Sequence, residues 1–139
     1  MAYQKTLRHA QAARSPHALA PLTCISPRLY LTSWEGAKNL AGRVALVAVA
    51  LPPTTGYMER SKAEYRGFVT AGDTLGMTQA KFNTVFGRAA KLLAKQLQDG
   101  SDRPVVVHCR AGINRSTACI LSYVRLYTTI NPAVALQCI

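Results

Sequence analysis

Acidic side chains are scarce in this chain. It has 6 Asp and Glu residues against 17 Lys and Arg residues, which gives a formal net charge of +11 at pH 7. Such a positive balance favours anionic partners through the summed field of the surface. Phosphorylated substrates, nucleic acid and acidic lipids are therefore the partner classes that the composition indicates.

Long hydrophobic runs are also missing. The longest one, Val44 to Leu51, is far shorter than the roughly 20 residues that a membrane-crossing helix needs, so the sequence excludes a transmembrane segment of that kind. With 139 residues, 49% of them hydrophobic, the chain is long enough for one domain with a buried core and too short for two. We expect a single globular domain.

Cysteine is sparse and shows no pairing pattern. Cys24, Cys109, Cys119 and Cys138 form no CxxC pair and no zinc-site spacing, so we expect neither a metal nor a cofactor. Free thiols in a reducing compartment are the default interpretation. It predicts a cytoplasmic protein, with a nuclear location as an alternative.

The first 24 residues form a basic segment that we expect to be flexible. Lys5, Arg8 and Arg14 lie in it, and residues 1–20 contain no Asp or Glu. This composition is typical of a basic tail and also of a mitochondrial transit peptide, and both interpretations stay open.

From residue 25 onward, short apolar runs alternate with helical patterns, which predicts a mixed α/β fold. Strands are expected over residues 28–31, 44–50, 65–70 and 104–107. After the first strand, Ser33 is a suitable N-cap for a brief helix that runs through Leu40 and ends at Gly42. The stretch from Pro52 to Lys62 is predicted to be a polar surface loop.

Three further helices follow from spacing and capping residues. The clearest lies between Thr78 and Gly100, where apolar side chains recur every three or four residues. A second is expected from about Arg115 to Tyr127. Asn131, followed by a proline, begins a third of about two turns.

The segment from His108 to Ser116 joins a buried strand to a helix. Its sequence, HCRAGINRS, places an arginine six residues after a cysteine, with a hydroxyl directly after the arginine. The amides of such a loop, together with the helix N-terminus, attract a phosphate, and Gly112 permits the backbone angles that this requires. The same field favours the nucleophilic thiolate of Cys109, and Arg115 offers a planar fork for two phosphate oxygens.

Neighbouring residues have supporting roles in this interpretation. The hydroxyl of Ser116 serves the sulfur as it leaves a phosphocysteine, and His108 orders the loop through backbone hydrogen bonds. A buried structural cysteine in a turn is the simpler alternative. In the phosphate-loop interpretation, the phosphate-binding residues are Arg110, Ala111, Gly112, Ile113, Asn114 and Arg115.

These nine residues resemble the signature of the dual-specificity protein phosphatases, His-Cys-x5-Arg-Ser/Thr, within the cysteine-based protein tyrosine phosphatase superfamily. SPRLYLTSWEGAKNL and VALVAVA are similar to the opening strand and helix and the central strand of that family. The resemblance covers about residues 25–139. It implies a catalytic domain with a central mixed, largely parallel sheet flanked by helices, and with shortened C-terminal helices because the chain ends inside the first of them.

The resemblance also implies a mechanism, in which Cys109 forms a phosphocysteine intermediate. In this family an upstream aspartate protonates the leaving oxygen and later activates water. Asp73, in TAGDTLG, is the candidate, because it follows a strand and precedes the long helix. An aspartate that merely serves a turn is the alternative for Asp73.

The substrate stays open between several classes. The short phosphate loop implies a shallow pocket that admits phosphotyrosine and phosphoserine or phosphothreonine of proteins. Asn114 stands where protein-directed members often carry serine, and members with asparagine include phosphatases of RNA 5′ ends. RNA 5′ ends or phosphoinositides are therefore alternative substrates, and a non-catalytic phosphate-binding module is a further alternative. Oxidation of Cys109 is a plausible regulatory step, with Cys24 or Cys119 as the protecting thiol.

Overall fold

The computed structural model describes residues 19–50, 62–72, 74–109 and 114–139. Strands and helices alternate along these residues, which confirms the predicted α/β class. In chain order the elements are β1 (Ala20–Pro21), β2 (Leu29–Ser33), α2 (Trp34–Ala37), β3 (Ala41–Ala50), β4 (Lys62–Thr70), α4 (Gln79–Leu97), β5 (Val105–Cys109), α5 (Asn114–Tyr127) and α6 (Pro132–Cys138).

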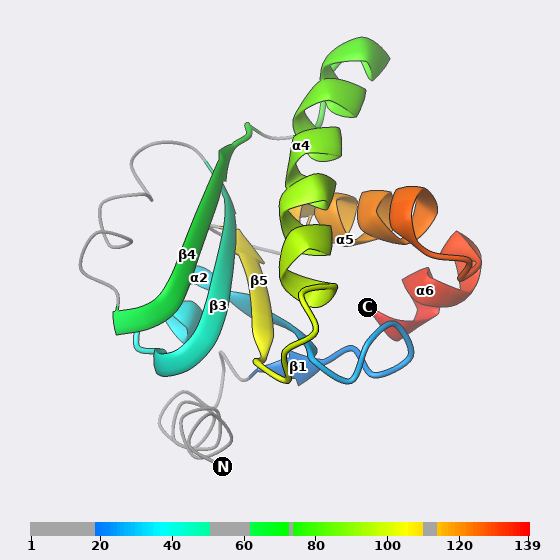
Figure 1. The fold of residues 1–139 in the computed structure, drawn as a ribbon. Coiled ribbons are helices and arrows are strands. Elements are labelled where there is room, and N and C mark those ends of the chain that lie inside the picture. The colour runs from blue at the N-terminus through cyan, green and yellow to red at the C-terminus, as the bar shows by residue number, and fades with distance from the viewer. Residues whose placement is uncertain (1–18, 51–61, 73, 110–113) are drawn as a thin grey trace.

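Five strands form one sheet in the order β1-β2-β5-β3-β4 (Figure 1). The pairs β2–β5, β5–β3 and β3–β4 are parallel, whereas the short edge strand β1 is antiparallel to β2. The sheet is therefore mixed and largely parallel, as predicted. Because parallel strands end at the same edge, Cys109 of β5, Ala50 of β3 and Thr70 of β4 lie along one edge of the sheet, which we call the carboxyl edge.

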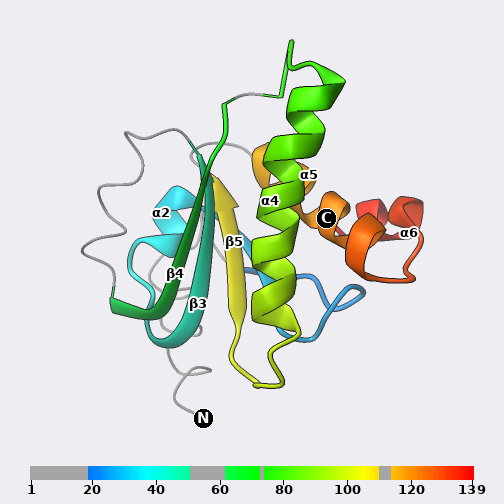
Figure 2. The ribbon, with the colours of Figure 1, turned by 45° about the horizontal axis from the view of Figure 1, so that its top comes forward.

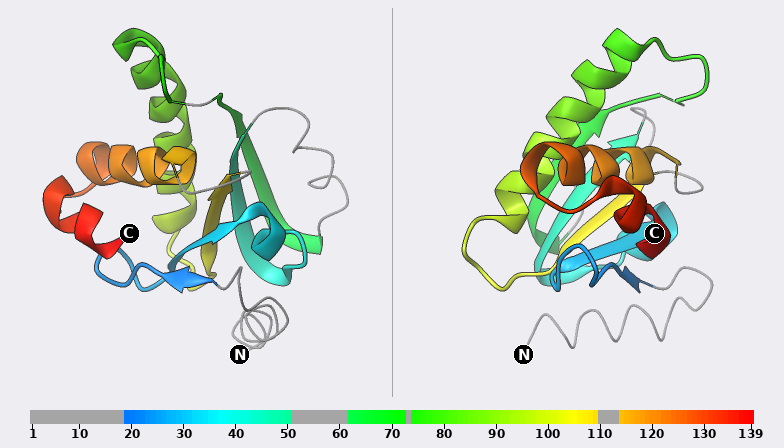
Figure 3. Two further views of the ribbon diagram at one scale, coloured as in Figure 1. Left: turned by 180° about the vertical axis from the view of Figure 1, so that it is seen from behind. Right: turned by 90° about the vertical axis from the view of Figure 1, so that its right-hand side faces the viewer.

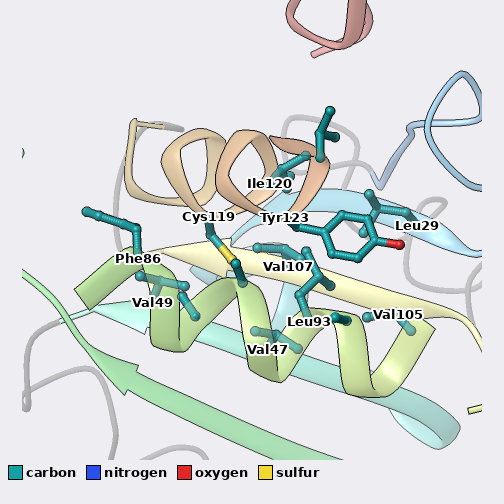
Figure 4. Packing of buried hydrophobic residues seen from close by; sticks show 14 of the residues in the cluster. Leu29, Val47, Val49, Phe86, Leu93, Val105, Val107, Cys119, Ile120 and Tyr123 are labelled. Atoms are coloured by element: carbon teal, nitrogen blue, oxygen red, sulfur yellow. The ribbon is translucent and has the colours of Figure 1, made fainter. Parts of the chain in front are cut away.

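Helices lie against both faces of this sheet. Figures 1 and 2 show α4 and α5 on one face and α2 on the other. The larger core lies under α4 and α5, where Phe86 and Leu93 of α4 and Ile120 of α5 pack against Val47 and Val107 of the sheet (Figure 4). β5 and residues 44–49 of β3 are buried on both sides, which explains their continuous apolar sequence.

The ends of α4 and α6 follow the predicted capping residues. The Thr78 side chain accepts a hydrogen bond from the Lys81 amide at 3.2 Å, and Gly100 has a φ of +80° shortly after α4 ends. Asn131 caps α6 by accepting from the Ala133 amide at 2.8 Å. Among the described residues, each helix is either too short or too polar to cross a lipid bilayer.

The C-terminus of α4 is held by a side chain that the sequence did not single out. Arg28, directly before β2, donates hydrogen bonds to the carbonyl oxygens of Leu97 at 2.7 Å, Gln96 at 2.9 Å and Arg103 at 2.9 Å. Carbonyl groups at the end of a helix otherwise lack partners. Arg28 therefore fixes α4 to the edge of the sheet opposite the carboxyl edge.

Two predicted boundaries were wrong. Helix α2 ends at Ala37, not Leu40, and Gly42 lies inside β3 with a φ of +83° instead of ending a helix. Strand β4 begins at Lys62, earlier than predicted, because Ala41 pairs with Lys62 and extends the parallel ladder through polar residues. Most of the predicted surface loop lies outside the described residues.

The fold also includes residues that we predicted to lie in the flexible segment. Leu19 and Leu22 are buried, and β1 pairs with β2, so the ordered domain begins before residue 25. Residues 1–18 lie outside the described residues.

The prediction of four free thiols was wrong. Cys24 and Cys138 form a disulfide with a Cα–Cα distance of 6.3 Å, whereas Cys109 and Cys119 are free. Figure 3 shows the connection between β1 and β2 lying beside α6, which brings the two cysteines together. No spacing pattern in the sequence indicates this pair, since 114 residues separate its members.

Candidate active site

Cys109 is the last residue of β5, at the carboxyl edge of the sheet. Its side chain is fully buried, and in the sheet register it lies opposite Ser33, the residue that ends β2. Strong pairing of β5 with β2 and β3 on its two sides fixes this position. The cysteine thus has a rigid support, which a nucleophile requires.

The first turn of α5 carries the other two signature side chains. α5 begins at Asn114, so Arg115 and Ser116 lie at its N-terminus, and four residues connect it to Cys109. The N-terminus of a helix carries partial positive charge and free amides, which suit an anion. The predicted phosphate-binding residues 110–113 lie outside the described residues.

Arg115 reaches the segment that follows β4. Its Nη1 atom donates a hydrogen bond to the carbonyl oxygen of Ala71 at 3.1 Å. Asp73, the predicted general acid, lies outside the described residues, two positions after Ala71. The structure therefore brings the signature arginine to the backbone directly after β4, although Arg115 and Ala71 are 44 positions apart in the sequence.

Ser116 is fully buried, and its hydroxyl oxygen has no hydrogen-bond partner in the described part of the chain. A buried hydroxyl without a partner loses its hydration and gains nothing in exchange, so such groups are uncommon in folded proteins. Ser116 thus presents an unused donor at the start of α5, seven residues after Cys109.

His108 is also fully buried, one residue before Cys109. Burial lowers its pKa from 6.5 to about 4, and a hydrogen bond with the backbone of Cys109 acts in the opposite direction. The imidazole is therefore neutral at pH 7, and its ordering role for the loop stays a prediction.

Cys119 belongs to the core rather than to the site. It lies in α5 and packs between the sheet and α4 (Figure 4). Burial raises the pKa of its thiol to about 12, so it stays protonated at neutral pH. Cys24 is already bonded to Cys138, which removes it as a free thiol that could protect Cys109.

Two open depressions border the segment between β4 and α4. One, of about 260 Å³, is lined by Phe68, Val69, Thr70 and Arg88. The other, of about 300 Å³, is lined by Gly72, Leu75, Gly76, Met77, Thr78 and Lys81. Sequence reasoning missed Lys81 and Arg88 as functional candidates, although their spacing on α4 was visible in the sequence.

The described residues contain no group of three or more His, Cys, Asp or Glu side chains that could hold a metal ion.

No protein-family model matches the sequence, and no curated protein matches it either. Solved structures do match. A human DUSP28 variant superposes with a TM-score of 0.61 at 20% identity, over 86% of this chain and 78% of the other. The kinase associated phosphatase with serine in place of its catalytic-site cysteine gives 0.60 at 12% identity, over 86% and 79%.

A third match is the human tyrosine phosphatase-like serine/threonine/tyrosine-interacting protein, with a TM-score of 0.56 at 19% identity, over 82% of this chain and 78% of the other. The shared architecture is the five-stranded mixed sheet with its flanking helices. These similarities show that the chain has the fold of the cysteine-based dual-specificity phosphatases.

Proposed function

We propose that this protein is a cysteine-dependent phosphatase that hydrolyses phosphotyrosine and phosphoserine or phosphothreonine esters in proteins. The observation that carries the proposal is the hydrogen bond from Arg115 to Ala71, because it joins the helix that follows Cys109 to the segment that contains Asp73. Among the described residues, Cys109 ends β5, and Arg115 in the first turn of α5 donates to Ala71, which directly follows β4; this arrangement supports a nucleophile and a phosphate-binding arginine at the carboxyl edge.

In the first step, the Cys109 sulfur attacks the phosphorus of a bound monoester and forms a sulfur–phosphorus bond. The bond between phosphorus and the leaving oxygen breaks, and Asp73 transfers a proton to that oxygen. In the second step, Asp73 accepts a proton from water as the water attacks the phosphocysteine. Inorganic phosphate and the thiolate are released.

Arg115 binds two oxygens of the phosphoryl group and stabilises the charge that they carry in the transition state. Its hydrogen bond to Ala71 holds the guanidinium against the backbone that follows β4, two positions before Asp73 in the sequence, and this supports a role for both residues at one site. Lysine lacks the planar fork that this arrangement requires.

Ser116 donates its hydroxyl proton toward the sulfur and stabilises the thiolate when it leaves the phosphocysteine. The support for this role is its buried hydroxyl, which has no other partner in the described part of the chain. The neutral imidazole of His108 holds the backbone at Cys109 and takes no part in proton transfer.

The proposal is tested by hydrolysis of para-nitrophenyl phosphate in the presence of EDTA. Cys109→Ser should abolish turnover, whereas Cys119→Ala, which removes the other free thiol, should leave it measurable. Asp73→Asn should remove the fall in kcat/KM on the alkaline side, because that fall reports deprotonation of the general acid. Folded wild-type protein without turnover would overturn the proposal and favour a phosphate-binding module.

Substrate class is tested separately with matched phosphopeptides. We expect turnover of peptides that carry phosphotyrosine and of the same peptides that carry phosphothreonine. Release of phosphate from 5′-phosphorylated RNA alone, with the peptides untouched, would reject a protein substrate while leaving the chemistry at Cys109 intact.

A further inference from the structure

The exposed face of α4 carries a row of cations. Lys81, Arg88, Lys91 and Lys95 are all exposed, and their spacings of seven, three and four residues place them on one side of the helix. With a rise of 1.5 Å per residue, the row extends over about 21 Å. We call these four side chains the basic ridge.

In the described part of the chain, no acidic side chain forms an ion pair with the ridge. α4 contains no Asp or Glu. The acidic side chains that the structure describes are all committed to ion pairs elsewhere, and none of these pairs includes a residue of the ridge. The pairs are Glu35–Lys38, Glu64–Arg103, Asp99–Arg28, Asp99–Arg103 and Asp102–Arg43.

The rest of the exposed face of α4 decides between classes of anionic partner. Its other exposed residues are small or polar, namely Gln79, Ala80, Asn83 and Thr84. A helix that binds a membrane surface presents large apolar side chains next to its cations, and protein interfaces depend on buried aromatic or apolar anchors. The exposed residues of α4 supply neither feature, and Leu75, which is 90% exposed and lines a depression with Lys81, precedes the helix. Phosphodiester backbones, in contrast, are bound mainly through cations and polar groups.

We propose that the basic ridge binds the sugar-phosphate backbone of single-stranded nucleic acid. A flexible single strand can follow a narrow row of cations through its phosphates, because counterion release supplies affinity that does not depend on sequence. The ridge leads toward the carboxyl edge, because Arg88 and Lys81 also line the two depressions beside the segment that follows β4. This inference depends on the charge arrangement of α4 and not on catalysis at Cys109.

The test uses a 20-nucleotide single strand with a 5′ hydroxyl and a 3′ fluorescein, as RNA and as DNA. It carries no phosphate monoester, so the proposed hydrolysis plays no part in the measurement. Fluorescence anisotropy over a series of salt concentrations gives the affinity and its salt dependence. Comparison of the RNA and DNA oligonucleotides distinguishes a preference for RNA from binding to the phosphodiester backbone that both contain.

The ridge variant is Lys81→Gln/Arg88→Gln/Lys91→Gln/Lys95→Gln. The plot of log K against log salt should become shallower, with the magnitude of its negative slope reduced by about 3, since each phosphate contact of a single strand contributes about 0.7. Binding should be weakened at least about tenfold at 100 mM salt. The matched control removes four charges elsewhere and should keep most of the affinity. It is Lys38→Gln/Arg43→Gln/Lys62→Gln/Arg125→Gln.

Circular dichroism and thermal unfolding establish that both variants are folded. If the fourfold ridge variant is unfolded, Lys91→Gln/Lys95→Gln replaces it, with an expected loss of slope of about 1.4. Equal losses in the ridge and control variants would overturn the proposal, because they would indicate attraction by net charge alone. Binding of anionic vesicles or polyglutamate in preference to both oligonucleotides would also overturn it.

Discussion

Arg115 and Ala71 are joined by a hydrogen bond of 3.1 Å from the guanidinium to a backbone carbonyl. This bond crosses 44 positions in the sequence and links the first turn of α5 to the residue directly after β4. The side chain that binds phosphate in the proposed mechanism is therefore attached to the backbone at the end of β4.

Arg115→Lys should lower kcat/KM for an aryl phosphate by about 100-fold or more, because the lysine keeps the charge but loses the fork that stabilises the transition state. The measurement is steady-state kinetics with para-nitrophenyl phosphate. Arg125→Lys, the same change in the last turn of α5, should leave the kinetics unaltered. Near-normal turnover in Arg115→Lys would contradict the role proposed for Arg115.

The fold was predictable where apolar pattern and local caps agree. The continuous apolar run before Pro52 could only be a strand buried on both faces, and Thr78 and Gly100 bound the longest helix. The failures share a different cause. Lys62 to Glu64 contain one small apolar residue, Ala63, and the start of this strand depends on the pairing of Lys62 and Ala63 with β3. The disulfide from Cys24 to Cys138 depends on tertiary proximity, which spacing does not encode.

The same distinction applies to the candidate site, where some features were predictable from the sequence and others were not. Cys109, Arg115 and Ser116 were predictable because nine consecutive residues contain them. The bond from Arg115 to Ala71 was not, since it joins two separate elements of the fold. The basic ridge was present in the sequence as a spacing of cations, but its significance depends on the commitment of the described carboxylates to other partners, which the fold determines.

Stability should fall in mildly acidic solution because of His108. Burial lowers its pKa to about 4 in the folded protein, whereas the unfolded chain has the ordinary value of 6.5. The unfolded state therefore binds a proton first as pH falls. The contribution of the neutral imidazole to the free energy of unfolding is complete above pH 6.5 and is lost between pH 6.5 and about 4. The difference between the folded and unfolded pKa of His108 corresponds to about 3 kcal/mol of unfolding free energy. Urea denaturation at pH 7.5, 6.5, 5.5 and 4.5 measures it.

The matched variant for this prediction is His108→Asn, which has no titratable group. Its absolute stability is expected to be lower, because the replacement leaves space in a buried site. The informative quantity is the change in stability with pH, which should be smaller than in the wild type between pH 6.5 and 4.5. Identical pH dependence in the two proteins would show that other groups cause the effect.

Reduction of the disulfide should destabilise the C-terminal helix first. Ala135 is the buried residue of α6, so much of the attachment of this helix depends on the bond between Cys24 and Cys138. A cross-link that closes so long a loop typically contributes about 2–4 kcal/mol. Dithiothreitol should lower the unfolding free energy of the wild type and increase amide exchange in α6. The Cys24→Ser/Cys138→Ser variant should show no response to the reductant.

Two glycine-to-alanine changes should have opposite effects on stability. In β4, a Cβ on Gly67 would lie 2.7 Å from Cδ2 of Leu92 and 2.9 Å from the hydroxyl of Tyr65, so α4 packs directly against this backbone. Both contacting groups are ends of partly buried side chains that pack against the core and must shift to make room, so we expect Gly67→Ala to destabilise the protein by about 1 kcal/mol.

Gly87, within α4, has no atom within 4 Å of the corresponding position. Gly87→Ala should therefore stabilise the protein by about 0.5–1 kcal/mol, because alanine loses less backbone entropy in a helix. Thermal and urea unfolding of the two variants measure both effects. A change in unfolding free energy of the same sign in both variants would contradict this prediction. It would mean that α4 does not approach β4 at Gly67 as closely as the structure indicates.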